Sequence, residues 1–143
     1  MREEEQDYVY ALFGDEESEK RLKDYVFYCG LRLALQEKWR MNGSAIVEKM
    51  SEIAVQEILH HRCTPCNGTG LDKKLRTCSH CCGVGVSRIP GRDISDMIGV
   101  EHSHFTRLWR RRYDCMYLTV QDIQGNLVSI IRRAENMEAI LLA

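Results

Sequence analysis

Residues 63–70 read CTPCNGTG and residues 78–85 read CSHCCGVG. In both stretches two cysteines are separated by two residues and are followed by glycines at alternate positions. Two cysteines at this spacing can direct their sulfurs at one ion if the chain turns tightly after them, and glycine permits that turn because it accepts a positive φ. One such knuckle supplies two ligands, and a structural zinc ion takes four. The sequence therefore predicts one zinc ion, bound by Cys63, Cys66, Cys78 and Cys81.

The alternatives for this segment explain the pattern less well. A redox motif of the thioredoxin type has one cysteine pair after a strand, whereas this chain has two pairs in glycine-rich turns. Adjacent cysteines rarely bind one ion together, so Cys82 is left outside the site, and His61 or His80 could replace one sulfur. A closed site of four sulfurs has no open coordination position and is structural rather than catalytic. Because the sequence also lacks a phosphate-binding glycine loop and an HExxH motif, we expect a protein that is not an enzyme.

Composition and charge agree with a globular protein of about one domain. The chain has 143 residues and a formal net charge of −1, but residues 1–62 hold 9 basic and 13 acidic side chains, whereas residues 63–143 hold 11 basic and 8 acidic ones. This asymmetry predicts two different surfaces. The N-terminus carries no apolar secretory segment, and no apolar run is long enough to span a membrane. We therefore expect a cytoplasmic protein, in which Cys29 and Cys115 are buried thiols rather than a disulfide.

Hydrophobic periodicity predicts helices before the cysteine segment. Residues 16–39 are apolar nearly all round in the middle of their length, which indicates a central, well-covered helix, and Gly30 marks a close helix crossing within it. A short helix is expected over residues 3–12. Ser44 is expected to cap a further helix over residues 45–60, which forms an antiparallel hairpin with the central helix.

The chain after the cysteine segment is also expected to be helical. A short helix over residues 93–98 is followed by a turn at Gly99 and a longer helix. A separate last helix is predicted over residues 119–141. Its buried side is expected to comprise Val120, Ile123, Leu127, Ile130, Ile131, Ala134, Met137 and Leu141.

The stretch EHSHFTRLWRRRYDCM, residues 101–116, has two contrasting faces. Its large apolar side chains fall together at helical spacing and are expected in the core, with Arg112 at the edge: Phe105, Trp109, Tyr113 and Met116. A short helix, a glycine turn and a second helix with exposed basic residues form the layout of a helix-turn-helix, whose second helix enters the major groove of double-stranded DNA. The predicted DNA contacts are the polar and basic residues of the opposite face: Ser103, His104, Arg107, Arg110 and Arg111. A solvated surface or a protein interface is the alternative for this face.

Two known families share parts of this sequence. The cysteine repeat resembles the zinc domain of DnaJ-type co-chaperones, but those carry four copies, and the HPD signature of their J-domain is absent here. A wider resemblance is to the lambda-type phage late-gene antitermination proteins, the Q proteins. In that family two such knuckles run into a Ser-Arg-x-Pro stretch, here Ser87, Arg88 and Pro90, and a Tyr-Asp pair lies along a basic helix, here Tyr113 and Asp114.

The resemblance to Q proteins implies a function that composition alone does not. Q proteins bind DNA at a phage late promoter, engage bacterial RNA polymerase that is paused with its sigma factor still attached, and travel with the polymerase past terminators. For this chain it implies a transcription antitermination factor in the cytoplasm of a bacterial host. The alternatives are a zinc-stabilised helix-turn-helix repressor or activator and a DnaJ-like protein-binding module.

The expected fold is mostly α. A helical domain carries an inserted zinc-knuckle segment with four cysteine ligands, and its C-terminal part is helix-turn-helix-like. The predicted organisation is an N-terminal helical hairpin over residues 1–61, a zinc-binding insertion over 62–86 and C-terminal helices over 87–143, all packed as one compact unit.

Overall fold

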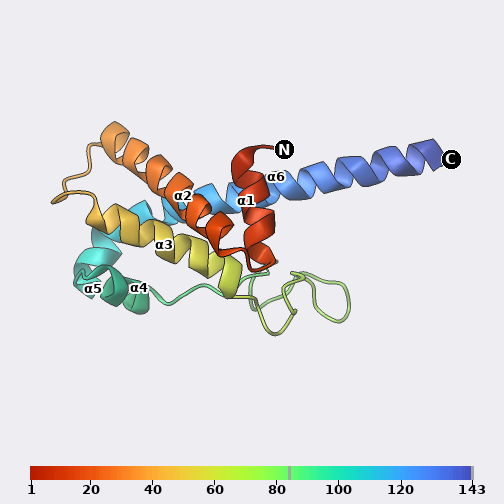
Figure 1. The fold of residues 1–143 in the computed structure, drawn as a ribbon. Helices are drawn as coiled ribbons and strands as arrows, with labels where there is room; N and C mark the ends of the chain where they lie inside the picture. The colour runs from red at the N-terminus through yellow and green to blue at the C-terminus, as the bar shows by residue number, and fades with distance from the viewer. Residues whose placement is uncertain (84, 143) are drawn as a thin grey trace.

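Helices make up most of the chain on both sides of the cysteine segment, as expected. The computed structural model describes residues 1–83 and 85–142, and no β-strand occurs among them (Figure 1). Val84 and Ala143, which belong to the predicted ranges 62–86 and 87–143, lie outside the described residues. The helical elements are α1 (Glu3–Leu12), α2 (Glu16–Glu37), α3 (Ala45–His60), α4 (Gly91–Ile98), α5 (His102–His104), the π-helical turn η1 (Phe105–Trp109) and α6 (Arg110–Leu142).

The predicted pairing of α2 and α3 is present, and the two helices run antiparallel along each other (Figure 1). Helix α2 ends where Lys38 adopts a left-handed conformation with φ of 54°. Gly30 lies at the crossing of α2 with α3 and α6. A Cβ atom at this position would lie 2.8 Å from both Val47 Cγ1 and Met116 Cε, so only glycine lets the helices approach this closely.

The main core is formed by one face of each of the long helices. The predicted core residues Phe105, Trp109, Tyr113 and Met116 are all buried, and they pack with residues of α2 and α3. The π-helical turn at the start of this face is marked by a bond from the backbone N–H of Arg110 to the carbonyl of Phe105. A regular helix was expected there, and the wider turn inserts one extra residue before α6 begins.

The prediction of a separate last helix over residues 119–141 is wrong. Helix α6 runs without a break from Arg110 to Leu142, because no proline and no tight turn interrupts it, and Gly125 is accommodated within the helix. The predicted buried side holds only as far as Leu127. Beyond that residue α6 extends past the other helices into solvent (Figure 1), so that these predicted core residues are exposed: Ile130, Ile131, Ala134, Met137 and Leu141.

Three smaller expectations also need correction. The outer face of α2 is not covered, since Tyr28 and Leu35 are exposed. Cys29 and Cys115 are half-buried rather than buried, because they lie at the edge of the contact between α2 and α6 and line one shallow groove. Ser44 precedes α3 but its side chain makes no capping hydrogen bond, because its backbone is already near the helical conformation.

The helix-turn-helix-like arrangement is present in the C-terminal part. Helix α4 ends at Gly99, whose φ of 75° allows the chain to reverse, and the N–H of Val100 bonds to the carbonyl of Ser95 at 3.0 Å. The next helical stretch then begins at His102. Among residues 1–83 and 85–142, no helix is both long enough and apolar enough to cross a bilayer.

Replacing Gly30 tests how tightly the helices cross. In an ordinary helix, Gly→Ala raises stability by about 1 kcal/mol, but overpacking of a core costs about 1–3 kcal/mol. We expect Gly30→Ala to lower the free energy of unfolding, measured by urea denaturation followed by circular dichroism. Gly125→Ala is the control, because its Cβ would meet nothing within 4 Å, and it should not destabilise. Equal or greater stability of Gly30→Ala would contradict the close crossing.

Candidate metal centre and cationic helix

The two cysteine knuckles bring four sulfur atoms together. One ligand atom from each of Cys63, Cys66, Cys78 and Cys81 lies within 4.8 Å of the other three, and all four residues are buried. They form a small cluster separate from the main core. Cys82 is exposed and takes no part in the cluster, and neither His61 nor His80 belongs to it. The four cysteines identified from their spacing could therefore hold one metal ion.

Glycines shape this centre because the two knuckles cross each other closely. A Cβ atom on Gly70 would lie 2.5 Å from the carbonyl oxygen of Gly83, and one on Gly85 would lie 2.6 Å from that of Gly68. Both Gly70 and Gly85 also have positive φ, of 76° and 82°. Any other residue at these two positions would force the knuckles apart.

The backbone of each knuckle also donates to a sulfur. The N–H of Gly70 lies 3.3 Å from Sγ of Cys66, and the N–H of Gly85 lies 3.2 Å from Sγ of Cys81. Burial opposes ionisation of the Cys66 thiol, but the backbone N–H groups of Gly70 and Gly68 and the neighbouring thiols outweigh it and lower its pKa to about 6. The adjacent Cys63 thiol shifts the other way, because burial raises its pKa to about 12. A sulfur that is readily ionised suits metal binding, because the thiolate is the ligand.

The distance between two of the four sulfurs matches that expected in a tetrahedral metal centre. Sγ of Cys66 and Sγ of Cys81 are 3.7 Å apart. A tetrahedral zinc ion with Zn–S bonds of about 2.3 Å separates its sulfurs by roughly 3.8 Å. The donor set, its burial and its spacing therefore fit the predicted group.

Removing one sulfur should abolish metal binding. We expect wild-type protein to bind about one equivalent of Zn²⁺ and Cys63→Ser to lose most of that binding, because a closed site needs all four ligands. The measurement is competition with a chromophoric chelator under reducing conditions. Cys82→Ser is the matched control, since Cys82 is exposed and outside the cluster, and it should bind as the wild type does. Equal loss in both variants would contradict the assignment of ligands.

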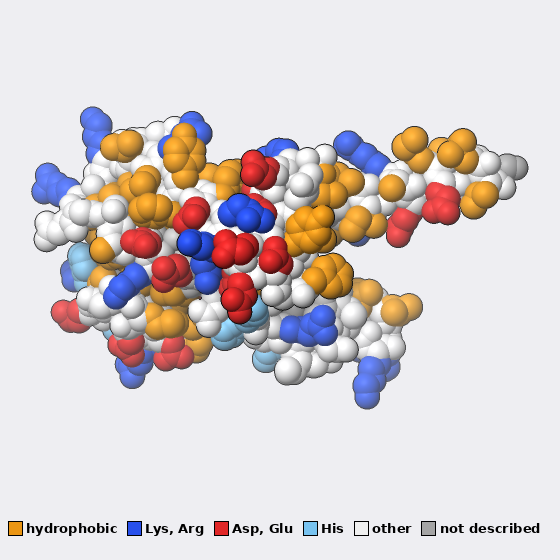
Figure 2. Space-filling model, in the orientation of Figure 1, with side chains coloured by type: hydrophobic (Ala, Val, Ile, Leu, Met, Phe, Trp, Pro, Cys, Tyr) orange, Lys and Arg blue, Asp and Glu red, His pale blue; other side chains and the backbone are white. Residues whose placement is uncertain are grey.

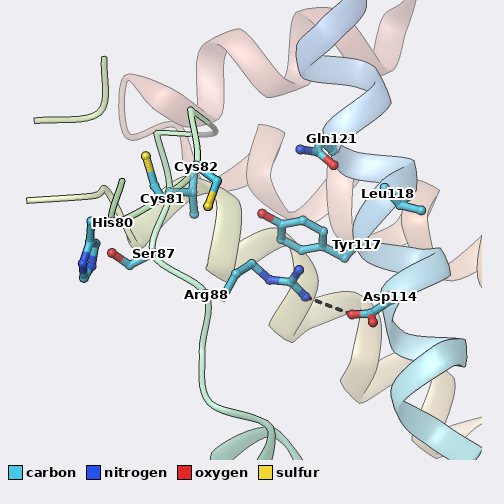
Figure 3. A pocket seen from close by; sticks show the side chains of 10 residues that line it. His80, Cys81, Cys82, Ser87, Arg88, Asp114, Tyr117, Leu118 and Gln121 are labelled. Carbon is cyan, nitrogen blue, oxygen red and sulfur yellow. Dashed lines mark hydrogen bonds and ion pairs between the residues drawn. The ribbon is translucent and has the colours of Figure 1, made fainter. Parts of the chain in front are cut away.

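The chain that leaves the second knuckle is held to the helical body by Arg88. Its Nε donates to Oε1 of Glu57 on α3. Its Nη2 donates to Oδ1 of Asp114 on α6 at 3.0 Å, the contact that Figure 3 shows as a dashed line. The guanidinium also lies over the ring of Tyr117, 3.8 Å from the centroid. One arginine therefore joins the knuckle segment to two helices.

Glu57 is the partner of Arg88 that lies inside the core. Its side chain is fully buried, and Tyr113 donates from its hydroxyl to Oε2 at 2.5 Å, while the N–H of Ile89 donates to Oε1 at 3.3 Å. Burial raises the pKa of Tyr113 above its usual value, and the charge of Glu57 raises it further. Sequence reasoning missed Glu57. Its only signal was its place on the apolar face of residues 45–60, seven residues after Met50.

The Tyr113 hydroxyl should contribute measurably to stability. A hydrogen bond to a charged group is worth about 1.5–3 kcal/mol, so we expect Tyr113→Phe to lower the free energy of unfolding by about that amount. Urea denaturation provides the measurement. Tyr28→Phe, which removes a hydroxyl from an exposed tyrosine, should change stability by less than about 0.5 kcal/mol. Similar stabilities of the two variants would show that the buried contact is unimportant.

The predicted DNA-binding residues do not share one environment. Ser103, His104, Arg107 and Arg111 are exposed, although His104 also accepts a hydrogen bond from Nε1 of Trp109 at 3.2 Å. Arg110 is only half-exposed, and its Nε lies 3.6 Å from Oδ2 of Asp114. The DNA contacts themselves stay a prediction, and Arg107 and Arg111 are the most available cations among the five.

A shallow hollow of about 400 Å³ adjoins this cationic face. It is lined by Glu37, Trp39, Arg107, Leu108, Arg111 and Arg112. Arg112 lies with its guanidinium 4.5 Å from the ring centre of Trp109 and 5.0 Å from that of Trp39, which agrees with its predicted place at the edge of the apolar face. Arg111 approaches Glu37 at 3.8 Å. The two indole rings therefore hold the guanidinium of Arg112 beside the exposed Arg107 and Arg111.

Comparison with protein-family models and with curated proteins gives no match that indicates a family. No protein-family model matches the chain, and no curated protein matches it with significant similarity.

Proposed function

We propose that the metal held by the four cysteines is a structural Zn²⁺ ion. Four buried cysteine sulfurs within 4.8 Å of one another suit zinc, and a set of four protein ligands leaves no position for a substrate. Zinc would join residues 63–66 to residues 78–81 and make the knuckle segment rigid, because metal binding contributes directly to the folding of such small units. This segment has little apolar core of its own beyond the sulfur cluster.

We further propose that the protein is a DNA-binding transcription antitermination factor that resembles the phage Q proteins. It would bind double-stranded DNA at a late promoter, load onto RNA polymerase paused with its sigma factor, and promote read-through of terminators. The observation that carries the proposal is the pairing of Arg88 with Asp114 at 3.0 Å. These residues belong to the two separate segments on which the resemblance rests.

The contact supports the proposal because of what it joins. Arg88 follows the zinc knuckles and Asp114 lies on the helix that carries the cationic face. A factor that holds DNA and polymerase at once needs these two parts at a fixed angle. The ion pair, the stacking of Arg88 on Tyr117 and the bond to Glu57 supply that rigidity.

The distribution of charged side chains supports binding to two different partners. Arg107 and Arg111 are exposed on the helical stretch that follows the helix-turn-helix-like turn and are suited to contact phosphates of DNA. Acidic residues are concentrated in the first turns of α1 and α2, where Glu3, Glu16 and Glu17 are exposed, and Figure 2 shows acidic side chains over this part of the molecule with basic ones among them. In this proposal the acidic surface faces the polymerase, because it would repel DNA.

Transcription in vitro tests the proposal. The template carries a candidate late promoter followed by an intrinsic terminator, and read-through and initiation are measured separately with purified polymerase and protein. We expect read-through to rise at constant initiation, and to fall back when Arg107 and Arg111 are both replaced by alanine or when zinc is chelated. The double variant should also flatten the salt dependence of binding to the promoter fragment, by a slope of about 1 for each phosphate that the variant no longer neutralises.

The control is Lys20→Ala, which removes an exposed cation from α2 and should change neither read-through nor the salt slope. Lowered initiation without read-through would instead identify a helix-turn-helix repressor. Binding of unfolded protein with indifference to DNA would identify a DnaJ-like module. If the protein binds DNA but does not change read-through, the proposed antitermination is wrong and the proposed DNA binding stands.

A further inference from the structure

The last part of α6, residues 128–142, carries an apolar stripe that nothing in the described chain covers. We call these residues the α6 tail. The stripe continues the face that is buried further up the helix, with apolar side chains three and four residues apart: Leu127, Ile130, Ala134, Met137 and Leu141. Leu127 is buried, whereas Met137 is 64% and Leu141 82% exposed. Figure 2 shows hydrophobic side chains along the projecting helix.

This spacing is the seam of a two-helix pair. Apolar residues that alternate three and four apart place a narrow stripe on one side of a helix, and two such stripes pack into each other. Ile131 and Ile140 widen the seam, while Arg132, Glu135 and Asn136 lie on the other side of the helix. The tail continues α6 and needs no nucleation of its own, but with its stripe in water it lacks the tertiary packing that supplies most of the stability of helices in proteins.

We infer that this partner is the α6 tail of a second copy of the chain, packed antiparallel. The tail cannot fold back onto its own stripe, because α6 is continuous to Leu142. A parallel copy is excluded by the body of the protein. In a parallel pair, α6 of the second copy would also lie beside residues 113–127 of the first chain. The face of α6 that the stripe continues is already covered there by α1, α2 and α3 (Figure 1).

The antiparallel arrangement meets no such obstacle. Residues 128–142 of each copy then lie along those of the other over about 22 Å, and the two bodies lie at opposite ends of this shared segment. In the register that sets Ile130 opposite Leu141 and Ala134 opposite Met137, no like charges face each other directly. Arg133 lies beside Ile140 of the second copy, whose side chain its methylene groups can cover, and Glu138 lies beside Ile131. This register therefore packs the stripe of each tail against that of the other without setting like charges against each other.

Sedimentation of the full chain tests the pairing. We expect a reversible monomer–dimer equilibrium between about 1 and 100 μM, the range in which an interface of modest size dissociates. Ile130→Asp with Met137→Asp, which puts two carboxylates in the seam, should raise the dissociation constant at least about tenfold. The matched control is Ser129→Asp with Asn136→Asp, which has the same spacing and charge on the outer side of the helix and should leave the constant within about twofold.

A cross-link tests the direction. A photoreactive residue at Leu141 should join the second copy near Ile130, and the joined peptides are read by mass spectrometry. A join between the two Leu141 positions would overturn the antiparallel arrangement. A monomer throughout this range, or equal dimerisation of the seam and control variants, would overturn the pairing and leave the stripe to a different protein. Circular dichroism of each variant establishes that the body remains folded.

Discussion

The buried carboxyl of Glu57 is the constraint on which the arrangement of the molecule depends. A carboxyl group with no exposed surface requires hydrogen-bond donors, since burying it without them is costly. Here the donors come from Arg88, Ile89 and Tyr113, which lie on the knuckle exit and on α6. Satisfying one side chain of α3 therefore brings three distant segments of the chain together and sets the angle between them.

The sulfur cluster plays a complementary part. It is a second, smaller core that does not share residues with the main one, so the knuckle segment and the helical body are stabilised by different chemistry. Apolar packing holds the helices, whereas metal and thiolate would hold the knuckles. Arg88 links these two units through its side chain, because it follows the second knuckle and its guanidinium lies among the helices.

The surfaces of the molecule are divided by chemistry in the same way. Exposed arginines lie on η1 and at the start of α6, acidic side chains near the starts of α1 and α2, and apolar side chains along the α6 tail. Each of these surfaces suits a different kind of partner. A rigid body that presents them at fixed positions agrees with a protein whose proposed work is to join other macromolecules rather than to catalyse a reaction.

The local features of the fold could be read from the sequence because their physical causes are local. The knuckles follow from cysteine spacing and glycine, and the core face of residues 105–116 follows from helical periodicity. The role of Glu57 could not be read, because its partner Arg88 is 31 residues away and glutamates are usually exposed. Periodicity likewise identified the apolar stripe of the α6 tail but not its exposure. Only the tertiary structure decides which part of a stripe is covered, because coverage depends on where the other helices end.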